Sequence, residues 1–221
     1  ATTEIYTLSL HDALPISAIS AQQKQSVERK YSMSNCTRRQ GKLHFISTRR
    51  PGKEFKKLYT EAFPAEERMP LFMLLCKANG TRAKFFTVFD GEMPVALLYN
   101  VYYRDIVYVF YFAVNNNLRG GGYGSRIMKT IRQKYKNRRL ILAVEKPDEN
   151  YENIAQRIKR LDFYKCCGFE QSGNSVKEGK VIYELLAHSE NESRVDMKEY
   201  YELMKNYFGK GLFALYKIAN R

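Results

Sequence analysis

The sequence has few of the residues from which disulfide frameworks and metal sites are built. Its 221 residues include four cysteines, none in a C-x-x-C pair, and three histidines. Small secreted domains stabilised by disulfides carry paired, regularly spaced cysteines, and this chain does not. We therefore expect a reducing, cytoplasmic location and no metal site. The adjacent Cys166 and Cys167 are interpreted as packing thiols.

Long apolar runs and acidic surplus are missing as well. No apolar run approaches the ~20 residues that a membrane-spanning helix needs, so no membrane association is expected. Lys and Arg total 37 against 23 Asp and Glu, which gives a net charge of +14. This surplus favours anionic partners such as nucleic acid, anionic lipid or a phosphorylated cofactor, without choosing among them.

Residues 1–32 are interpreted as foreign to the protein. Within Ala1–Ile16, the run EIYTLSLHDALPI is the translation of a common sequencing adapter in one reading frame. No methionine precedes Met33, which is the expected native start, so residues 17–32 would be read-through of upstream sequence. We expect one domain at residues 33–188, followed by a helical extension at 189–221.

Hydrophobic patterns predict an α/β (α+β) fold. Two β-rich runs joined at Asp90-Gly91 are typical of a hairpin. Residues 105–114 are apolar on both faces and predict a central strand. The tail predicts a helix with Met197, Tyr200, Tyr201, Met204 and Phe208 on one face. The other expected elements are strands at 42–48, 138–145, 169–173 and 180–188, and helices at 54–63, 66–79, 124–137 and 153–168.

Four glycines stand between the central strand and the next helix, in the stretch FAVNNNLRGGGYGSRIMKTI. Glycine inside a helix costs about 1 kcal/mol relative to alanine, so this run suggests a backbone that approaches a ligand closely. It is not a phosphate-binding P-loop, because Gly124 is followed by Ser125-Arg126 instead of Lys-Ser or Lys-Thr. The dinucleotide pattern G-x-G-x-x-G also fails, since residues 125 and 127 are not glycine.

At these residues the sequence resembles the GNAT family of N-acetyltransferases, from about Lys42 to His188. The segment Arg119 to Gly124, RGGGYG, matches the family's pyrophosphate loop, Arg/Gln-x-x-Gly-x-Gly/Ala. The strand YFAV precedes it, and FYKCCGFE is similar to the family's F-Y-x-x-x-G-F signature. The resemblance implies an acyl-CoA acyltransferase fold: a mixed, largely antiparallel sheet of about six to seven strands with helices on both faces.

The resemblance also implies acetyl-CoA as the acyl donor. Backbone N–H groups at a helix N-terminus can hold its pyrophosphate, and the preceding strand would pair with its pantetheine arm and polarise the thioester. Arg157 occupies the position where the family often has asparagine, so Asn153, four residues earlier, is carried as a cofactor contact. The cofactor-binding residues expected are Phe112, Ala113, Val114, Arg119, Gly120, Gly121, Gly122, Tyr123, Gly124, Ser125 and Asn153.

The implied reaction is direct attack of an amine on the acetyl thioester. Tyr164 matches a tyrosine that many members place beside the sulfur, where a phenol could protonate the departing thiolate; the alternative is a core aromatic. The amine must first lose a proton. Glu145, at the end of LILAVE, is the candidate base, and a water chain is the alternative. Glu67 is expected to contact the acceptor.

Two acceptor classes stay open, a small-molecule amine and a protein amine, and so do a monomer and a homodimer. The rival function is a basic nucleic-acid-binding module with a regulatory or vestigial acyl-CoA site. Basic pairs at Arg38-Arg39, Arg49-Arg50 and Arg138-Arg139 motivate it. They are scattered and not interleaved with aromatics, so nucleic acid is the less favoured partner.

Overall fold

The structure is a computed structural model, and it describes residues 41–47, 51–63, 68–78, 80–149, 151–179, 181–188 and 195–219. The expectations for residues 1–32, for Glu67 and for the basic pairs at Arg38-Arg39 and Arg49-Arg50 lie outside these residues.

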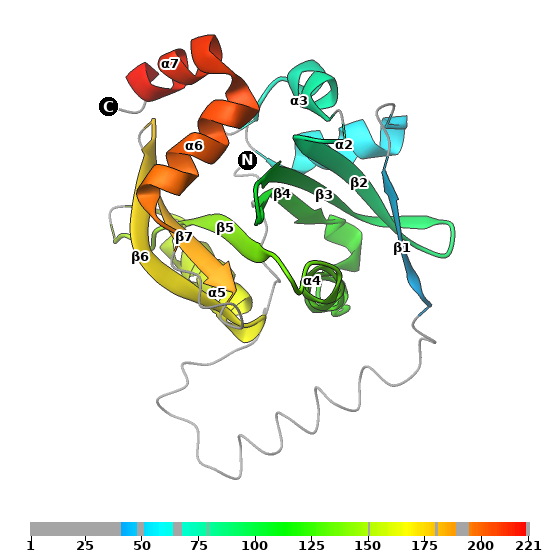
Figure 1. Cartoon of the computed structure of the whole chain (residues 1–221). Helices are drawn as coiled ribbons and strands as arrows, with labels where there is room; N and C mark the ends of the chain where they lie inside the picture. The colour runs from blue at the N-terminus through cyan, green and yellow to red at the C-terminus, as the bar shows by residue number, and fades with distance from the viewer. Residues whose placement is uncertain are drawn as a thin grey trace, which may run out of the picture.

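Seven strands form one open sheet (Figure 1), in the order β1-β2-β3-β4-β5-β7-β6. The pair β4–β5 is parallel and the other neighbours are antiparallel. The predicted mixed, largely antiparallel sheet is therefore confirmed. The strands are β1 (Leu43–Ser47), β2 (Ala83–Asp90), β3 (Met93–Tyr103), β4 (Ile106–Val114), β5 (Arg139–Glu145), β6 (Phe169–Glu178) and β7 (Val181–His188).

Helices cover both faces of the sheet, as predicted (Figure 1). One core cluster joins the sheet to α2, α3, α6 and α7, with Tyr59, Leu74 and Tyr207 among its buried members. The other joins the opposite face to α4 and α5, through Ile127 and Leu161. The helices are α2 (Lys53–Ala62), α3 (Leu71–Lys77), the 3₁₀ turn η2 (Asn116–Leu118), α4 (Tyr123–Lys134), α5 (Ile154–Cys166), α6 (Met197–Phe208) and α7 (Lys210–Ala219).

The β2–β3 hairpin turns one residue later than predicted. Asp90 pairs with Met93, so the two-residue loop is Gly91-Glu92, and Gly91 takes a left-handed φ of 62°. Glycine in the first loop position suits a type II′ turn, which matches the strand twist. Asp90 is therefore the last residue of β2 and not part of the loop. Its carboxylate accepts a hydrogen bond from the Tyr123 hydroxyl at 2.8 Å. The hairpin tip thus tethers the start of α4.

Strand β4 leaves its parallel neighbour half-way along. It pairs with β3 as far as Val114, but with β5 only from Ile106 to Val109. The register with β3 shifts at the same point, leaving Phe110 as a bulged residue. A bulge bends its strand and strengthens the local twist. Because β5 stays paired with β7 as far as Glu145, a gap opens in the middle of the sheet.

The C-terminal helices pack on the domain. Lys77 Nζ donates to the carbonyl oxygens of Tyr207 and Phe208 at 2.9 and 3.1 Å, which ties α3 to the end of α6. Tyr201 was expected on the inner face but is 39% exposed. The buried face of α6 is formed instead by Tyr200, Leu203, Met204 and Tyr207.

We predict that the free energy of unfolding falls as the pH rises above about 10, where tyrosine ionises in the unfolded chain. The hydroxyl oxygens of Tyr99 and Tyr207 lie 3.1 Å apart, and Tyr99 donates to the carbonyl oxygen of Leu74 at 3.0 Å. Burial raises the pKa of both phenols above the ordinary value of 10. The fold therefore keeps protons that the unfolded chain releases. Urea denaturation at neutral and alkaline pH measures this loss.

Tyr207→Phe is the matched control for the pH dependence. It removes one of the two phenols, so its stability should fall less steeply with alkaline pH than that of the wild type. Equal slopes for the two proteins would contradict the prediction.

Candidate active site

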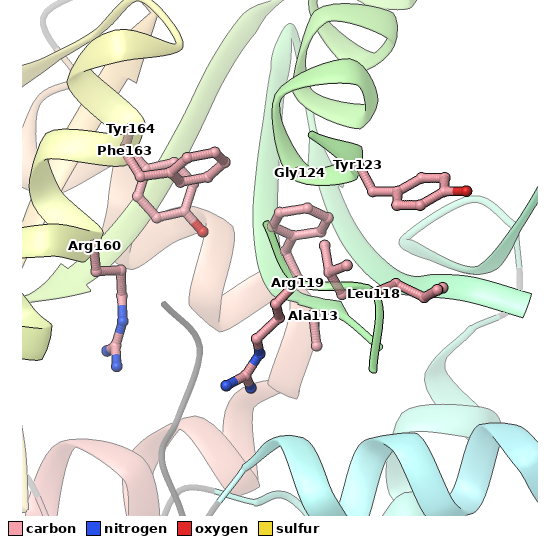
Figure 2. A pocket seen from close by; sticks show the side chains of 10 residues that line it. Ala113, Leu118, Arg119, Tyr123, Gly124, Arg160, Phe163 and Tyr164 are labelled. Atoms are coloured by element: carbon pink, nitrogen blue, oxygen red, sulfur yellow. The ribbon is translucent and has the colours of Figure 1, made fainter. Parts of the chain in front are cut away.

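A narrow slot lies where β4 and β5 diverge (Figure 2). The end of β4, the glycine loop with the start of α4, and α5 each contribute to its walls. The residues that line it are Phe112, Ala113, Val114, Leu118, Arg119, Tyr123, Gly124, Arg160, Phe163 and Tyr164. The structure therefore brings the predicted loop, the predicted strand and Tyr164 to one place.

The glycine loop is shaped by its own short-range hydrogen bonds. The Asn115 side chain accepts from the N–H of Asn117 at 3.1 Å, and Gly121 N–H donates to the carbonyl oxygen of Leu118 at 3.3 Å. Gly120 and Gly122 have φ of 75° and 73°, the left-handed region in which side chains are strained. Gly122 is the N-cap of α4, so this turn sets where the helix begins.

The loop fits the pyrophosphate of coenzyme A. A Cβ built on Gly120 or Gly122 would meet no atom within 4 Å, so the absent side chains leave open space beside the backbone. The N–H groups of Gly124 and Ser125, in the first turn of α4, have no acceptor within the helix and lie at its positive end. Open space beside such donors is what an anion needs.

Tyr123 divides its roles between backbone and ring. Its backbone starts α4 beside the slot, whereas Figure 2 shows its ring directed away from Arg160 and Tyr164. The ring is held by Asp90 and by the Arg126 guanidinium, 5.4 Å from its centroid. Arg126 also lies 3.7 Å from Asp90. This cluster anchors α4 to the β2–β3 hairpin.

Strand β4 offers backbone donors to the gap. The N–H of Asn115 donates to the carbonyl oxygen of Val95 in β3 at 2.8 Å. Since successive N–H groups along a strand point to opposite sides, those of Phe112 and Val114 point the other way, toward the side that β5 has left. A ligand with carbonyl and amide groups in an extended chain could pair with them as an added strand would.

Tyr164 projects from α5 into the slot, with its hydroxyl toward β4 (Figure 2). Its ring also packs on Phe163 and Phe169, at centroid distances of 5.0 and 5.9 Å. Burial raises the pKa of Tyr164 well above its ordinary value, although the charge of Arg160 opposes the shift. The phenol is therefore protonated at neutral pH. The hydroxyl reaches the slot and the ring packs on other aromatic rings, so these contacts do not choose between an acid and a core aromatic.

Glu145 is held by two arginines. Its side chain is buried, 2% exposed, and forms ion pairs with Arg157 at 3.4 Å and with Arg160. A carboxylate between two guanidinium groups would have to give up these pairs to accept a proton from an amine. Its surroundings therefore differ from those expected of a general base.

Arg157 occupies the position where the family often has asparagine, and it is not among the residues that line the slot. Its guanidinium donates to Asn153 Oδ1 at 2.9 Å and to the carbonyl oxygen of Lys146 at 3.1 Å, and lies 3.6 Å from the Tyr151 ring centroid. Asn153 thus has its amide oxygen engaged by Arg157, and it is absent from the slot lining.

The sequence interpretation missed three lining residues, Leu118, Arg160 and Phe163. Arg160 precedes Tyr164 by four residues on α5, which places both on one helical face, so this spacing could have identified it. Figure 2 shows Arg119 and Arg160 extending toward the same side of the slot. The Arg119 guanidinium favours an anionic ligand there, whereas Arg160 is ion-paired with Glu145.

Other expectations concern the thiols, metals and the membrane. Burial raises the pKa of Cys167 to about 11, which leaves an unreactive thiol beside the exposed Cys166. Within the described ranges, no group of three His, Cys, Asp or Glu side chains could hold a metal ion. Over the same ranges, no helix combines the length and apolarity of a membrane span.

Splayed central strands beside a glycine-rich helix N-terminus are the arrangement that the resemblance to the GNAT family predicts. The model of the Acetyltransferase (GNAT) family matches residues 52–169, more than half of the chain. The protein therefore belongs to this family of acetyltransferases. No curated protein sequence matches the chain.

Solved structures share the fold. A GNAT-family acetyltransferase structure from Bacteroides thetaiotaomicron has a TM-score of 0.56 and 24% identity, covering 78% of this chain and 98% of its own. A Bacillus subtilis acetyltransferase in complex with CoA has a TM-score of 0.50 and 15% identity, and the match covers 66% of this chain and 97% of the Bacillus chain. A spermidine N-acetyltransferase chimera from Vibrio cholerae and hSSAT has a TM-score of 0.52 and 15% identity. The match covers 68% of this chain and 96% of the chimera.

We predict that Glu145→Gln lowers the free energy of unfolding by about 3 kcal/mol or more, because it leaves Arg157, 3% exposed, as a buried charge without its carboxylate. Urea denaturation measures the loss. Asp105→Asn is the control: Asp105 pairs with Arg139, but its side chain is 52% exposed, so we expect less than about 1 kcal/mol. Equal small losses in both variants would contradict the buried role.

Proposed function

We propose that this protein is an acetyl-CoA-dependent N-acetyltransferase that acetylates a primary amine by direct attack in a ternary complex. The observation that carries the proposal is the convergence at one slot of the glycine loop, the unpaired edge of β4 and the Tyr164 phenol. Membership of the GNAT family supports the acetyl transfer. That the acceptor is a primary amine, and that it attacks in a ternary complex, are the further parts of the proposal.

Acetyl-CoA supplies the acetyl group as a thioester. Under the proposal, the first-turn N–H groups of α4 and the Arg119 guanidinium bind the pyrophosphate, with Gly120 and Gly122 clearing the approach. The N–H groups of Phe112 and Val114 bind the extended arm and donate to the carbonyl oxygen that gains negative charge. Asn153, as predicted, would be a lesser contact.

Tyr164 is the proposed acid. As the bond from the amine nitrogen to the carbonyl carbon forms, the carbon–sulfur bond breaks and the sulfur needs a proton. The half-buried phenol is protonated at neutral pH and can donate to the sulfur as its charge develops. Arg160, beside the phenol in the slot lining, tempers the rise in its pKa and so makes it a better donor.

The general base stays a prediction. Glu145 remains the candidate named from the sequence, but its two ion pairs favour a positioning role, in which it holds Arg160 beside Tyr164. A water chain is the alternative carrier of the proton. The Glu145→Gln variant separates a positioning role of Glu145 from a role as the base. A loss of stability supports positioning, whereas a loss of kcat with unchanged stability supports a base.

The acceptor is proposed at the level of a primary amine on a small molecule or a protein. The spermidine acetyltransferase chimera shows that a protein of this fold can take a polyamine, while the +14 charge of this chain disfavours a polycation. Glu67, predicted to contact the acceptor, lies outside the described residues. We expect a cytoplasmic monomer or homodimer.

We predict that Gly122→Glu weakens acetyl-CoA binding at least about 100-fold, equivalent to about 2.7 kcal/mol. The new carboxylate would occupy the open space beside the loop and repel the pyrophosphate. Isothermal titration of the full chain with acetyl-CoA measures the change. No binding by the wild type would refute the proposed function.

Gly173→Glu is the matched control. Gly173 also has a left-handed φ, 78°, with no atom within 4 Å of a built Cβ, but it lies in β6 away from the slot. Both variants carry the same backbone strain and charge change, so only the loop variant should lose binding. Equal losses would attribute the effect to strain.

We predict that Tyr164→Phe lowers kcat about 10²- to 10⁴-fold and leaves acetyl-CoA binding within a few-fold, because only the proton donor is removed. A thiol-release assay with an accepted amine measures kcat. Because the pKa of Tyr164 is raised, its ionisation should not lower the wild-type rate below about pH 10. Tyr201→Phe, at an exposed tyrosine of α6, is the control. An unchanged kcat in Tyr164→Phe would remove the acid role.

A further inference from the structure

One half-buried carboxyl under the C-terminal helices has no part in the proposed reaction. Glu178 is the last residue of β6, and its side chain shares a face with that of Val176, which belongs to the core beneath α6 and α7. Helix α7 lies beside this end of β6 (Figure 1), and its Tyr216 hydroxyl donates to Glu178 Oε1 at 2.7 Å. In the described part of the chain, this is the one hydrogen bond of the carboxyl.

The charge of Glu178 is not neutralised by any described residue. Its carboxylate forms no ion pair with a described Lys, Arg or His side chain, whereas Glu145 is paired with both Arg157 and Arg160. Burial raises the pKa of Glu178, and neighbouring tyrosine hydroxyls oppose the shift. A carboxylate that is partly removed from water without a counter-ion costs free energy, and a bound cation would offset that cost.

Two buried tyrosines present hydroxyls to the same place. Tyr200 of α6 and Tyr108 of β4 are 0% and 3% exposed, and their ring centroids lie 5.8 Å apart. Burial raises the pKa of both phenols, and the nearby charge of Glu178 raises each further.

The Tyr200 hydroxyl has no hydrogen-bond partner among the described residues. It lies close to the hydroxyls of Tyr108 and Tyr216 and to the Glu178 carboxyl, but none of these is placed to form a hydrogen bond with it. Because buried hydroxyl groups are nearly always paired, this oxygen points to a ligand that would bind between Tyr200 and Glu178.

Tyr108 connects the cluster to the gap in the sheet. Its ring lies 5.5 Å from that of Phe110, the bulged residue at which β4 leaves β5. Under the proposed function, the pyrophosphate lies at the loop that follows Val114, so the acetyl end of the extended arm lies toward Phe110. Phe110 packs on the core beneath α6, whereas Tyr164 packs on the opposite core. An acceptor near Glu178 would thus attack from the face opposite to the proposed acid.

A primary ammonium group matches this arrangement chemically. It carries one positive charge and three N–H donors and has no acceptor. Glu178, Tyr200 and Tyr108 offer one carboxylate and two phenol oxygens as acceptors. The surrounding aromatic rings are also favourable for a cation.

We propose that Glu178, Tyr200 and Tyr108 form the binding site for the ammonium group of the acceptor amine. This inference rests on the proposed function and deepens it, because it assigns the acceptor to one face of the gap and to three residues. Tyr216 is a positioning residue, since its hydrogen bond orients the Glu178 carboxyl.

The test uses the full chain saturated with CoA, so that the slot is occupied. Phenethylamine is the probe, and 2-phenylethanol, which has a neutral hydroxyl in place of the ammonium, is the matched compound. By calorimetry, the wild type should bind the amine at least about tenfold more tightly than the alcohol. Glu178→Gln should abolish this preference. Glu170→Gln, the same change at an exposed position of β6, should keep it.

Thermal unfolding separates binding from a structural role. Glutamine keeps an oxygen that can accept from Tyr216, so Glu178→Gln should have the Tm of the wild type or a higher one. Tyr200→Phe removes a hydroxyl without a partner, so its Tm should not fall either, yet it should bind phenethylamine about tenfold more weakly. Tyr201→Phe, at the exposed neighbouring position, should change neither quantity.

Titration with acetyl-CoA alone tests the proposed function separately. If acetyl-CoA does not bind, the proposed function fails, and the comparison of amine with alcohol on the chain without CoA still decides the ammonium site. The ammonium site is overturned if the wild type binds the two compounds equally or binds neither. It is also overturned if both glutamine variants lose the preference, or if Glu178→Gln alone lowers the Tm, which would assign Glu178 to the support of α7.

Discussion

The divergence of β4 from β5 is the constraint on which the site depends. Parallel strands normally satisfy each other's backbone groups, and an interior strand with a free edge is costly unless something pairs with it. Here the Phe110 bulge bends β4 away after Val109, while β5 remains on β7. The gap therefore exposes backbone donors in the middle of an otherwise continuous sheet, and the glycine loop follows directly at its end.

Charged clusters hold the two walls of the gap in place. On one side, Asp90 binds Tyr123 and Arg126 and fixes α4 to the β2–β3 hairpin. On the other side, Glu145 at the end of β5 binds Arg160 of α5. Hydrogen bonds between ionised groups are stronger and more directional than neutral ones. Each wall is thus fixed close to the slot, which matters because catalytic groups lose effect when displaced by about 1 Å.

The two ends of helix α4 differ in their electrostatics. At its N-terminus the donors are backbone groups exposed by glycine, with the positive end of the helix dipole behind them. At its C-terminus the dipole is negative and attracts cations, and Arg132 and Lys134 lie in the last turn. The net charge of +14 does not say which cations are neutralised by carboxylates. Arg139, for example, is paired with both Asp105 and Glu199.

The sequence by itself determined the fold class, the order of elements and the position of the loop, because glycine punctuation and hydrophobic period are local properties. It also predicted Tyr164 and the strand ending at Val114 as neighbours of the loop, through motif resemblance. Tertiary structure alone decided the partners of Glu145 and the engagement of Asn153 by Arg157. Those depend on which side chains distant segments bring within a few ångströms, and residue spacing along the chain carries no record of that distance.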